Sequence, residues 1–219
     1  GNIVIIIDDF GYRDDNVSEG FLLLDANLTF AVIPGHHNSK VFAAKAAQRG
    51  FEVIVHMPME SKTKTPGEKE YMLTTSMTSS EIENRVEQVI AEFPEAVGMN
   101  NHQGSKATAD KRIMNIVSNI LKRHEKYFID SRTTAETVAE TTMRSRGIPT
   151  MRRHVFLDNE NKKIKIREQL YKLVDKAESK GLAVGIGHAK INTFEVLKEE
   201  IPKLKEYGFE FQFASFAVE

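Results

Sequence analysis

Residues 3–11 read IVIIIDDFG, five consecutive β-branched apolar residues followed by two aspartates, a phenylalanine and a glycine. An unbroken β-branched run of this kind is typical of a strand buried on both faces, as in parallel sheets. Functional side chains of parallel α/β folds gather at the carboxyl ends of their strands. The stretch therefore predicts a buried parallel strand that presents Asp8 and Asp9 at the functional edge of the sheet.

Short apolar runs alternate along the chain with longer amphipathic segments. The predicted strands cover residues 3–7, 28–33, 52–55, 96–99, 127–129, 150–154, 182–186 and 209–213. The predicted helices cover residues 16–24, 39–48, 80–93, 111–124, 135–143, 163–180 and 194–207. Ser79 and Ser80 with Glu83 fit a capping box at the start of the third helix. Left-handed glycines that end helices are predicted between a helix and the next apolar run, at Gly50, Gly147, Gly181 and Gly208.

Repeated strand–helix units predict an α/β fold with a parallel sheet covered by helices. Seven or eight such units, with no linker or repeat between them, favour one compact barrel-like domain over residues 1–219. The polar segment 61–78 is long for a structureless connection, so it is expected to be either a surface loop or a substrate-facing one.

The composition excludes several classes of protein. Lys and Arg number 30 against 31 Asp and Glu, so no basic excess favours a nucleic-acid partner. The longest apolar run has five residues, where a membrane-spanning helix needs ~20, so no membrane span is expected. The absence of cysteine excludes disulfides, thiolate metal sites and cysteine nucleophiles. The chain begins with Gly1 instead of Met, and we expect the native N-terminus, with any signal peptide, to be missing.

Titratable or metal-ligating residues follow six of the predicted strands. They are Asp8 and Asp9, His56 and Glu60, Asn101 and His102, Asp130 and Arg132, His154 and Asp158, and His188. Each is unremarkable alone, because a pair of aspartates is often a turn and a lone histidine is more often a hydrogen-bonded structural group. Together, aspartate and two histidines suit Zn²⁺ or another divalent transition metal.

The remaining histidines are read separately. His124 lies in a charged helical stretch and is expected to be solvated. His36 and His37 follow Pro34 and Gly35 in a loop at the same edge as the other candidates. His154 precedes an apolar run and is expected to be half buried.

These residues resemble the motifs of polysaccharide deacetylases, and most closely those of the divergent polysaccharide deacetylase branch. The motifs are IIIDDFG at 5–11, RGFEVIVH at 49–56, HMPME at 56–60, NNHQGS at 100–105, FIDS at 128–131 and GH at 187–188. The resemblance runs from residue 3 to about residue 213. It implies a distorted (β/α) barrel with seven or eight mainly parallel strands, and an exported protein.

The resemblance also implies roles for individual residues. Asp8 corresponds to the catalytic base, Asp9 and His56 to metal ligands, and His188 to an assisting acid. The ordinary family has its second metal histidine four residues after the first, where this chain has Glu60. We therefore expect His102 to supply that imidazole. The remaining candidates for orienting a ligand or contacting substrate are Glu60, Asn101, Asp130, Arg132 and Asp158.

The implied function is metal-dependent hydrolysis of N-acetyl or O-acetyl groups on a carbohydrate polymer or oligosaccharide, with Zn²⁺ as the leading metal. The metal would activate water and polarise the carbonyl, while Asp8 accepts a proton and His188 donates one. Asp130 is a candidate for orienting a histidine. Arg132 is read equally as holding a substrate anion or an aspartate, or as a surface charge at a helix start.

Two other readings stay open. A glycan-binding or regulatory protein that has lost turnover is favoured by the missing second histidine of the ordinary motif. A different metal hydrolase, acting on phosphodiesters or carboxyesters, is the third reading. The sequence shows no Arg or Lys cluster beside the motifs, which disfavours a phosphate substrate. The residues do not indicate an oligomeric state.

Overall fold

A single parallel sheet forms the centre of the protein, whose computed structural model describes residues 1–63 and 67–218. Within these residues the sheet has nine strands. They are β1 (Asn2–Phe10), β2 (Thr29–Val32), β3 (Glu52–Met59), β4 (Gly98–Gln103), β5 (Tyr127–Asp130), β6 (Thr150–Arg152), β7 (Val155–Phe156), β8 (Leu182–His188) and β9 (Glu210–Gln212). The order is β6-β5-β4-β3-β2-β1-β8-β7, with β9 also paired to β1, and every pairing is parallel. The α/β fold with a distorted barrel of mainly parallel strands is therefore confirmed.

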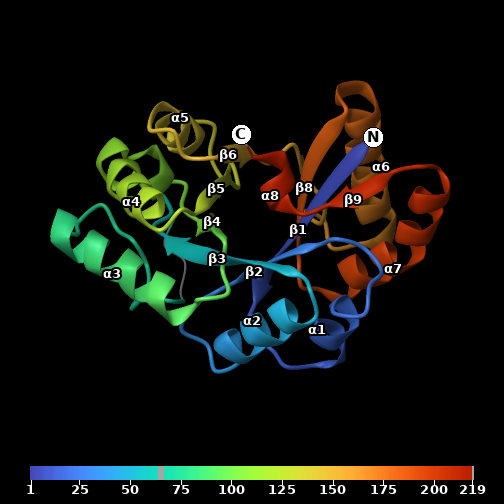
Figure 1. The fold of residues 1–219 in the computed structure, drawn as a ribbon, viewed down its shortest axis with the longest axis horizontal. Coiled ribbons are helices and arrows are strands. Elements are labelled where there is room, and N and C mark those ends of the chain that lie inside the picture. The colour runs from blue at the N-terminus through green and yellow to red at the C-terminus, as the bar shows by residue number, and fades with distance from the viewer. Residues whose placement is uncertain (64–66, 219) are drawn as a thin grey trace.

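The helices surround the curved sheet on its outer side (Figure 1). They are α1 (Asn16–Phe21), α2 (Ser39–Gln48), α3 (Ser79–Glu92), α4 (Lys111–Arg123), α5 (Ala139–Ser145), α6 (Lys163–Lys180) and α7 (Ile191–Glu206), with a 3₁₀ turn η1 (Ala107–Ala109) before α4. The short α8 (Ala214–Ala217) instead packs against the inward face of the sheet. No helix among the described residues is both long and apolar enough to cross a membrane.

The strand predicted at 150–154 is shorter than expected, because β6 ends at Arg152 and a second strand, β7, begins at Val155 on the opposite edge of the sheet. β6 pairs with β5, whereas β7 pairs with β8. The backbone N–H of Arg153 bonds to Asp130 O, and the next N–H, that of His154, bonds to Val184 O. The chain itself therefore bridges the two edges at Arg153 and His154, and this crossing closes the barrel.

Several element ends differ from the prediction. β3 and β4 extend through the polar residues that the sequence predicts to follow them, because the two strands stay paired as far as Met59 and Gln103. Helix α5 begins at Ala139, later than the predicted 135. The capping box before α3 joins Thr78 and Glu81 instead of Ser79 or Ser80 and Glu83. The predicted left-handed glycines are confirmed, with φ of 83° at Gly50, 69° at Gly147, 80° at Gly181 and 85° at Gly208.

Strand alternation divides the apolar core into two parts. Ile3, Ile5 and Ile7 of β1 pack outward against the helices, in the larger cluster. Val4 and Ile6 point inward, in a smaller cluster that includes residues of α8. The same inward face continues at Asp8, since side chains two apart on a strand share a face. The barrel interior therefore changes from apolar to polar toward the carboxyl ends of its strands.

Candidate metal and catalytic site

Inward-facing polar residues of β4, β3, β1 and β8 meet at the carboxyl end of the barrel. Asp8 on β1 is the register partner of His188 on β8. His56 on β3 is the register partner of Asn100 on β4. Asn100 and His102 are two residues apart and so share the inward face. The parallel register therefore brings together residues separated by as many as 180 positions of sequence.

Asp8 and Asp9 both reach the site although consecutive strand residues normally point to opposite faces. Asp9 has a left-handed backbone, with φ of 69°. The pairing of β1 with β2 also shifts between Ile7 and Phe10. This irregularity turns the chain at Asp9, so that Asp8 stays buried at 3% exposure while the side chain of Asp9 remains 26% exposed beside it.

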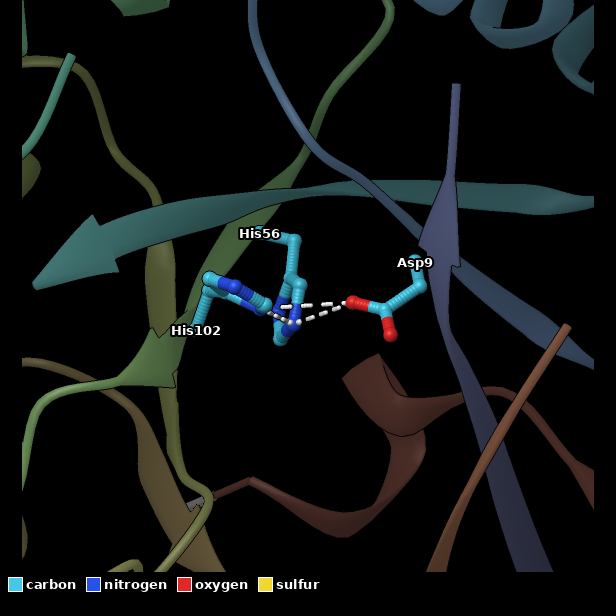
Figure 2. A group of neighbouring side chains, drawn as sticks. All are labelled: Asp9, His56 and His102. Atoms are coloured by element: carbon cyan, nitrogen blue, oxygen red, sulfur yellow. Dashed lines mark hydrogen bonds and ion pairs between the residues drawn. The ribbon is translucent and has the colours of Figure 1, made fainter. Parts of the chain in front are cut away.

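Asp9, His56 and His102 form a group that fits a divalent metal ion (Figure 2). Asp9 Oδ1 lies 3.3 Å from His56 Nε2 and 3.2 Å from His102 Nδ1, and the two nitrogens are 3.0 Å apart. Asp9 Oδ1 is buried without a hydrogen bond to any described residue. One carboxylate oxygen and two imidazole nitrogens are ligand types that Zn²⁺ and related ions take. The donor set therefore fits the ion that the sequence predicts.

Charge is concentrated around this group. Burial raises the pKa of Asp9, but the His102 and His56 imidazoles lower it further, and the result is a pKa well below the usual range. Burial lowers the pKa of His56, but the carboxylates of Asp8 and Asp9 raise it to about 9. Without a metal, His56 therefore carries a proton at neutral pH, in the place where a cation would sit.

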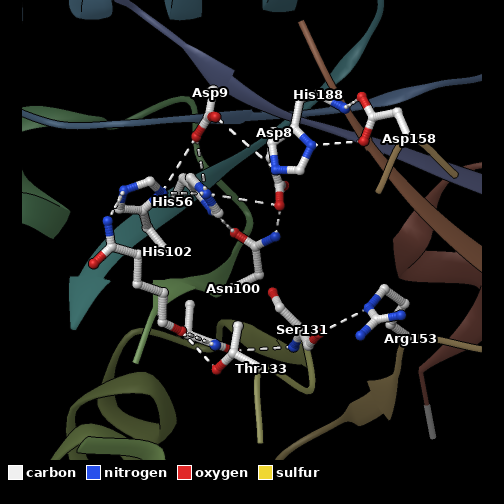
Figure 3. A network of polar contacts seen from close by, with 12 residues as sticks. Asp8, Asp9, His56, Asn100, His102, Ser131, Thr133, Arg153, Asp158 and His188 are labelled. Carbon is white, nitrogen blue, oxygen red and sulfur yellow. Dashed lines mark hydrogen bonds and ion pairs between the residues drawn. The ribbon is translucent and has the colours of Figure 1, made fainter. Parts of the chain in front are cut away.

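Asn100 joins the metal group to Asp8 (Figure 3). Its Nδ2 donates to Asp8 Oδ1 at 2.8 Å, and its Oδ1 lies 2.7 Å from His56 Nδ1. Because Asn100 Oδ1 can only accept, His56 Nδ1 carries a hydrogen and Nε2 faces the metal group. Asp8 itself stays outside the group of three ligands, and burial raises its pKa above the ordinary value.

His188 is held by Asp158. Asp158 Oδ1 lies 2.8 Å from His188 Nδ1, and Asp158 Oδ2 accepts from the His188 backbone N–H at 2.8 Å and from Thr193 Oγ1 at 2.7 Å. His188 Nε2 then faces Asp9 Oδ2 at 3.9 Å. Burial lowers the pKa of His188, but Asp158 raises it, and the net shift is upward.

Two of the other predicted residues, Glu60 and Asn101, are engaged away from the metal group. Glu60 accepts from the Thr75 backbone N–H at 2.7 Å and from Lys106 Nζ at 2.7 Å, and so fastens two loops together. Asn101 bonds to Gln103 O and to the Ser131 backbone N–H. Among the described residues, neither side chain forms a hydrogen bond or ion pair with Asp9, His56 or His102.

Asp130 binds no histidine among the described residues, so Asp158, not Asp130, is the carboxylate that orients one. Asp130 accepts from the Arg132 backbone N–H at 2.8 Å and from Thr137 Oγ1 at 2.9 Å. Arg132, with φ of 50°, lines a cavity beside the metal group. Asp130 thus shapes the turn that carries Arg132.

Sequence reasoning missed Glu68, which comes from the polar segment 61–78. Its side chain is only 4% exposed. Its Oε1 accepts from Tyr12 Oη at 2.6 Å and lies 2.8 Å from His36 Nε2, while its Oε2 lies 3.8 Å from His102 Nε2, the nitrogen that faces away from the metal group. No periodicity marks this loop residue. Residues 64–66 of the segment, predicted as a surface or substrate-facing loop, lie outside the described part of the chain.

Two cavities flank the metal group. One, of about 330 Å³, is lined by Asp9, Tyr12, Arg13, Ser18, His188, Ala189 and Lys190. The other, of about 400 Å³, is lined by Asp8 and His102 on one side and by Arg132 and Arg153 on the other. The prediction that no arginine or lysine cluster lies beside the motifs is therefore wrong, because the closing of the barrel brings Arg153 next to Arg132.

Comparisons with known proteins place the chain in a family context. The family model described as "Divergent polysaccharide deacetylase" matches residues 5–218. The uncharacterized protein YibQ of Escherichia coli K12 is 36% identical over 204 residues, which are 93% of this chain and 63% of the relative. The chain thus spans less than two thirds of that relative's length.

Solved structures share the fold. The uncharacterized protein ATU2773 of Agrobacterium tumefaciens C58 superposes with a TM-score of 0.92 at 18% identity, covering 99% of this chain and 89% of that one. The catalytic domain of a peptidoglycan N-acetylglucosamine deacetylase from Eubacterium rectale has a TM-score of 0.55 at 15% identity, with 98% and 89% covered. A mutant of BA3943, a CE4 family pseudoenzyme with restored enzymatic activity, has a TM-score of 0.58 at 15% identity, with 97% and 65% covered.

Proposed function

The chain belongs to the divergent polysaccharide deacetylase family, and on this basis we propose that it is a metal-dependent hydrolase that removes N-acetyl or O-acetyl groups from a carbohydrate polymer. The observation that carries the proposal is the position of Asp8. A buried carboxylate that is not one of the three ligands lies beside the group of Asp9, His56 and His102, with His188 on the next strand. The proposal also includes export of the protein, which is supported only by its membership of the family.

Asp9 Oδ1, His56 Nε2 and His102 Nδ1 would hold the metal, with Zn²⁺ as the leading candidate. When bound, such an ion lowers the pKa of a water molecule and polarises a carbonyl group. Asn100 keeps the His56 imidazole in the tautomer whose Nε2 is free to bind.

Asp8 serves as the general base in this proposal. Its Oδ2 lies 3.6 Å from His56 Nε2, so it borders the metal group without competing for the ion. Its Oδ1 is held by Asn100, which leaves Oδ2 to take a proton from the attacking water. Burial raises its pKa, which strengthens it as a base while it remains ionised.

His188 serves as the general acid. The Asp158 carboxylate accepts the Nδ1 hydrogen, so the second nitrogen, Nε2, points toward the metal group and can deliver a proton to the departing amine or alcohol. The upward shift of its pKa favours the protonated form that an acid requires. The proposed base and acid are register partners on adjacent strands.

A catalytically weak or inactive glycan-binding protein is the second candidate. It is favoured by Glu60, which occupies the position of the ordinary second histidine and is bound to Thr75 and Lys106. A pseudoenzyme with the same fold is also known. The position of His102, which completes the ligand group from a different strand, supports the hydrolase.

The test is acetate release from N-acetylglucosamine oligomers and from O-acetylated oligosaccharides by the Zn²⁺-loaded protein. We expect release that stops after chelation and returns with added Zn²⁺, and that falls about 10²–10⁴-fold in Asp8→Asn. No release from any oligomer, combined with oligomer binding measured by calorimetry, would replace the hydrolase with the binding protein.

A further inference from the structure

The larger cavity beside the metal group has an unusual wall. Its volume is about 400 Å³, and it reaches from Asp8 and His102 across to the turn after β5 and the crossing that closes the barrel. The far wall contains Ser131, Arg132 and Arg153. Figure 3 shows Ser131 and Arg153 on the opposite side of Asn100 from Asp9 and His102. The cavity therefore joins the reacting centre to a separate set of polar groups.

Arg153 is fixed in place by the protein backbone. Its Nε donates to Ser131 O at 2.8 Å and its Nη2 donates to Arg132 O at 3.1 Å. The guanidinium also lies over the ring of Phe156, 5.0 Å from the centroid. These contacts orient the guanidinium without neutralising its charge, since carbonyl oxygens and an aromatic ring carry no net charge.

No carboxylate neutralises either arginine at close range. Among the described residues, no aspartate or glutamate oxygen forms an ion pair with the side chain of Arg132 or Arg153. Burial, followed by the positive charge of Arg132, lowers the pKa of Arg153, and the charges of Asp8 and Asp130 offset this only in part. Two partly buried guanidinium groups thus lie near each other, although arginines buried in proteins are ordinarily paired.

The hydroxyl of Ser131 independently indicates that a hydrogen-bonding ligand belongs in this cavity. The residue is 7% exposed, and its Oγ is buried without a hydrogen bond to any described residue. A buried hydroxyl without a partner is costly and rare in proteins. Ser131 lines the same cavity wall as the two arginines, so a bound group with acceptor oxygens would satisfy the hydroxyl and both cations together.

We propose that this wall of the cavity binds an oxyanion substituent carried by the glycan, so that the substrate is an acidic N-acetylated glycan instead of a neutral one. The proposal rests on the proposed function and specifies its substrate class. Guanidinium groups bind carboxylate and phosphate oxygens with paired, charge-assisted hydrogen bonds. A neutral sugar would cover the two cations and leave their charges without compensation.

The test compares three N-acetylated oligosaccharides of equal length with the Zn²⁺-loaded protein. One is a neutral N-acetylglucosamine oligomer, one carries a carboxylate on alternate sugars, and one carries a phosphate. Binding is measured by calorimetry and turnover by acetate release. We expect the acidic oligomer to bind about 10- to 100-fold more tightly than the neutral one, an advantage that shrinks as the salt concentration rises. The carboxylate and phosphate arms identify which oxyanion the wall prefers.

Variants connect this advantage to the wall. Arg132→Gln and Arg153→Gln should each remove most of the ratio between acidic and neutral binding. Arg152→Gln is the matched control, because Arg152 is exposed, pairs with Glu140 and does not line the cavity. If Arg153→Gln fails to fold, Arg132→Gln alone decides the question. The Arg132 side chain makes no hydrogen bond or ion pair with the described residues, so its replacement tests the charge alone.

The outcomes separate the inference from the proposed function. Arginine-dependent binding of the acidic oligomer without acetate release would support the oxyanion site and contradict the deacetylase. Acetate release with equal affinity for neutral and acidic oligomers would overturn the oxyanion site and leave the deacetylase standing. Equal affinities together with arginine-dependent binding of free acetate would also overturn it, because the wall would then serve the product.

Discussion

Asn100 donates a hydrogen bond of 2.8 Å from its side-chain nitrogen to Asp8 Oδ1, so an uncharged strand residue orients the proposed base. The same amide reaches His56 at 2.7 Å. Asn100→Ala leaves both partners buried without it, and we expect a loss of about 1–3 kcal/mol in the free energy of unfolding, measured by chemical denaturation. Metal affinity should fall about 10- to 100-fold, because the tautomer of His56 is no longer held. Asn192→Ala, at the surface, is the control and should change neither quantity.

Substitutions of the adjacent residues Asp8 and Asp9 should impair different properties of the protein, namely turnover and metal binding. Asp9→Asn removes a ligand oxygen, so we expect the purified protein to lose stoichiometric metal. Asp8→Asn keeps the shape of a residue outside the ligand group, so metal content should stay at one ion per chain while acetate release falls. Elemental analysis of the two variants measures the difference. Loss of metal in Asp8→Asn would make Asp8 a ligand and remove it as the base.

Metal affinity should depend on pH through His56. Its pKa of about 9 in the metal-free protein means that an ion must displace a proton at neutral pH. Below pH 9 we therefore expect the apparent affinity to weaken by about tenfold for each unit that the pH falls, with one proton released per ion. Calorimetry in buffers of different ionisation enthalpy counts that proton. The surface variant His124→Ala should leave the count unchanged, and a count of zero near pH 7 would contradict the raised pKa.

The same shift predicts how the stability of the metal-free protein changes with pH. The folded-state pKa of His56 lies above the unfolded value of 6.5. Its contribution to stability is therefore fully present below pH 6.5 and is lost as the pH rises toward 9. His56→Gln removes the titrating group, so thermal unfolding of this variant should lose part of the decline that the unmutated protein shows over that range. An unchanged decline would assign it to other groups.

Glu68 should strengthen the ligand role of His102. Its carboxylate faces the outer nitrogen of that histidine at 3.8 Å, on the side away from the metal group. A carboxylate at this position favours the tautomer that leaves Nδ1 free, and its loss in comparable sites costs about 10- to 100-fold in metal affinity. Glu68→Gln should therefore weaken Zn²⁺ binding by that factor in a competitive chelator titration. Glu70→Gln, an exposed neighbour in the same loop, should leave the affinity unchanged.

Gly104 and Gly181 offer a matched pair of substitutions. Both have a left-handed backbone, with φ of 90° and 80°, so alanine costs about 1–2 kcal/mol of unfolding free energy at either position. A Cβ at Gly104 would also lie 2.9 Å from Met59 Cβ, whereas a Cβ at Gly181 meets nothing within 4 Å. Gly104→Ala should therefore be the more destabilising, by about 1–3 kcal/mol of overpacking, and should also weaken metal binding at nearby His102. Equal losses in chemical denaturation would contradict the crowding at Gly104.

Local chemistry in the sequence was enough to predict the strand–helix alternation and the residue types of the candidate site. The β-branched run at 3–7 indicates a buried strand because its propensity and hydrophobicity are local properties. The alternation of side chains along β4 is also a local property, and it places Asn100 on the same inward face as His102 and Asn101 on the other face. The end of a strand is harder to predict, because it depends on how far the neighbouring strand continues to pair with it. β3 and β4 show this, since their pairing continues to Met59 and Gln103.

Only the tertiary structure could decide which of these residues meet. The choice of Asp158 over Asp130 as the partner of His188 depends on the pairing of β7 with β8, and the position of Arg153 beside Arg132 depends on the crossing that closes the barrel. Glu68 reaches His102 from a loop without any repeating pattern. The sequence alone determined the fold class and the chemistry available to it, because strand propensity and side-chain type are properties of single residues and short segments. The assembled site was decided by strand register and barrel closure, which arise from contacts between segments far apart in the chain.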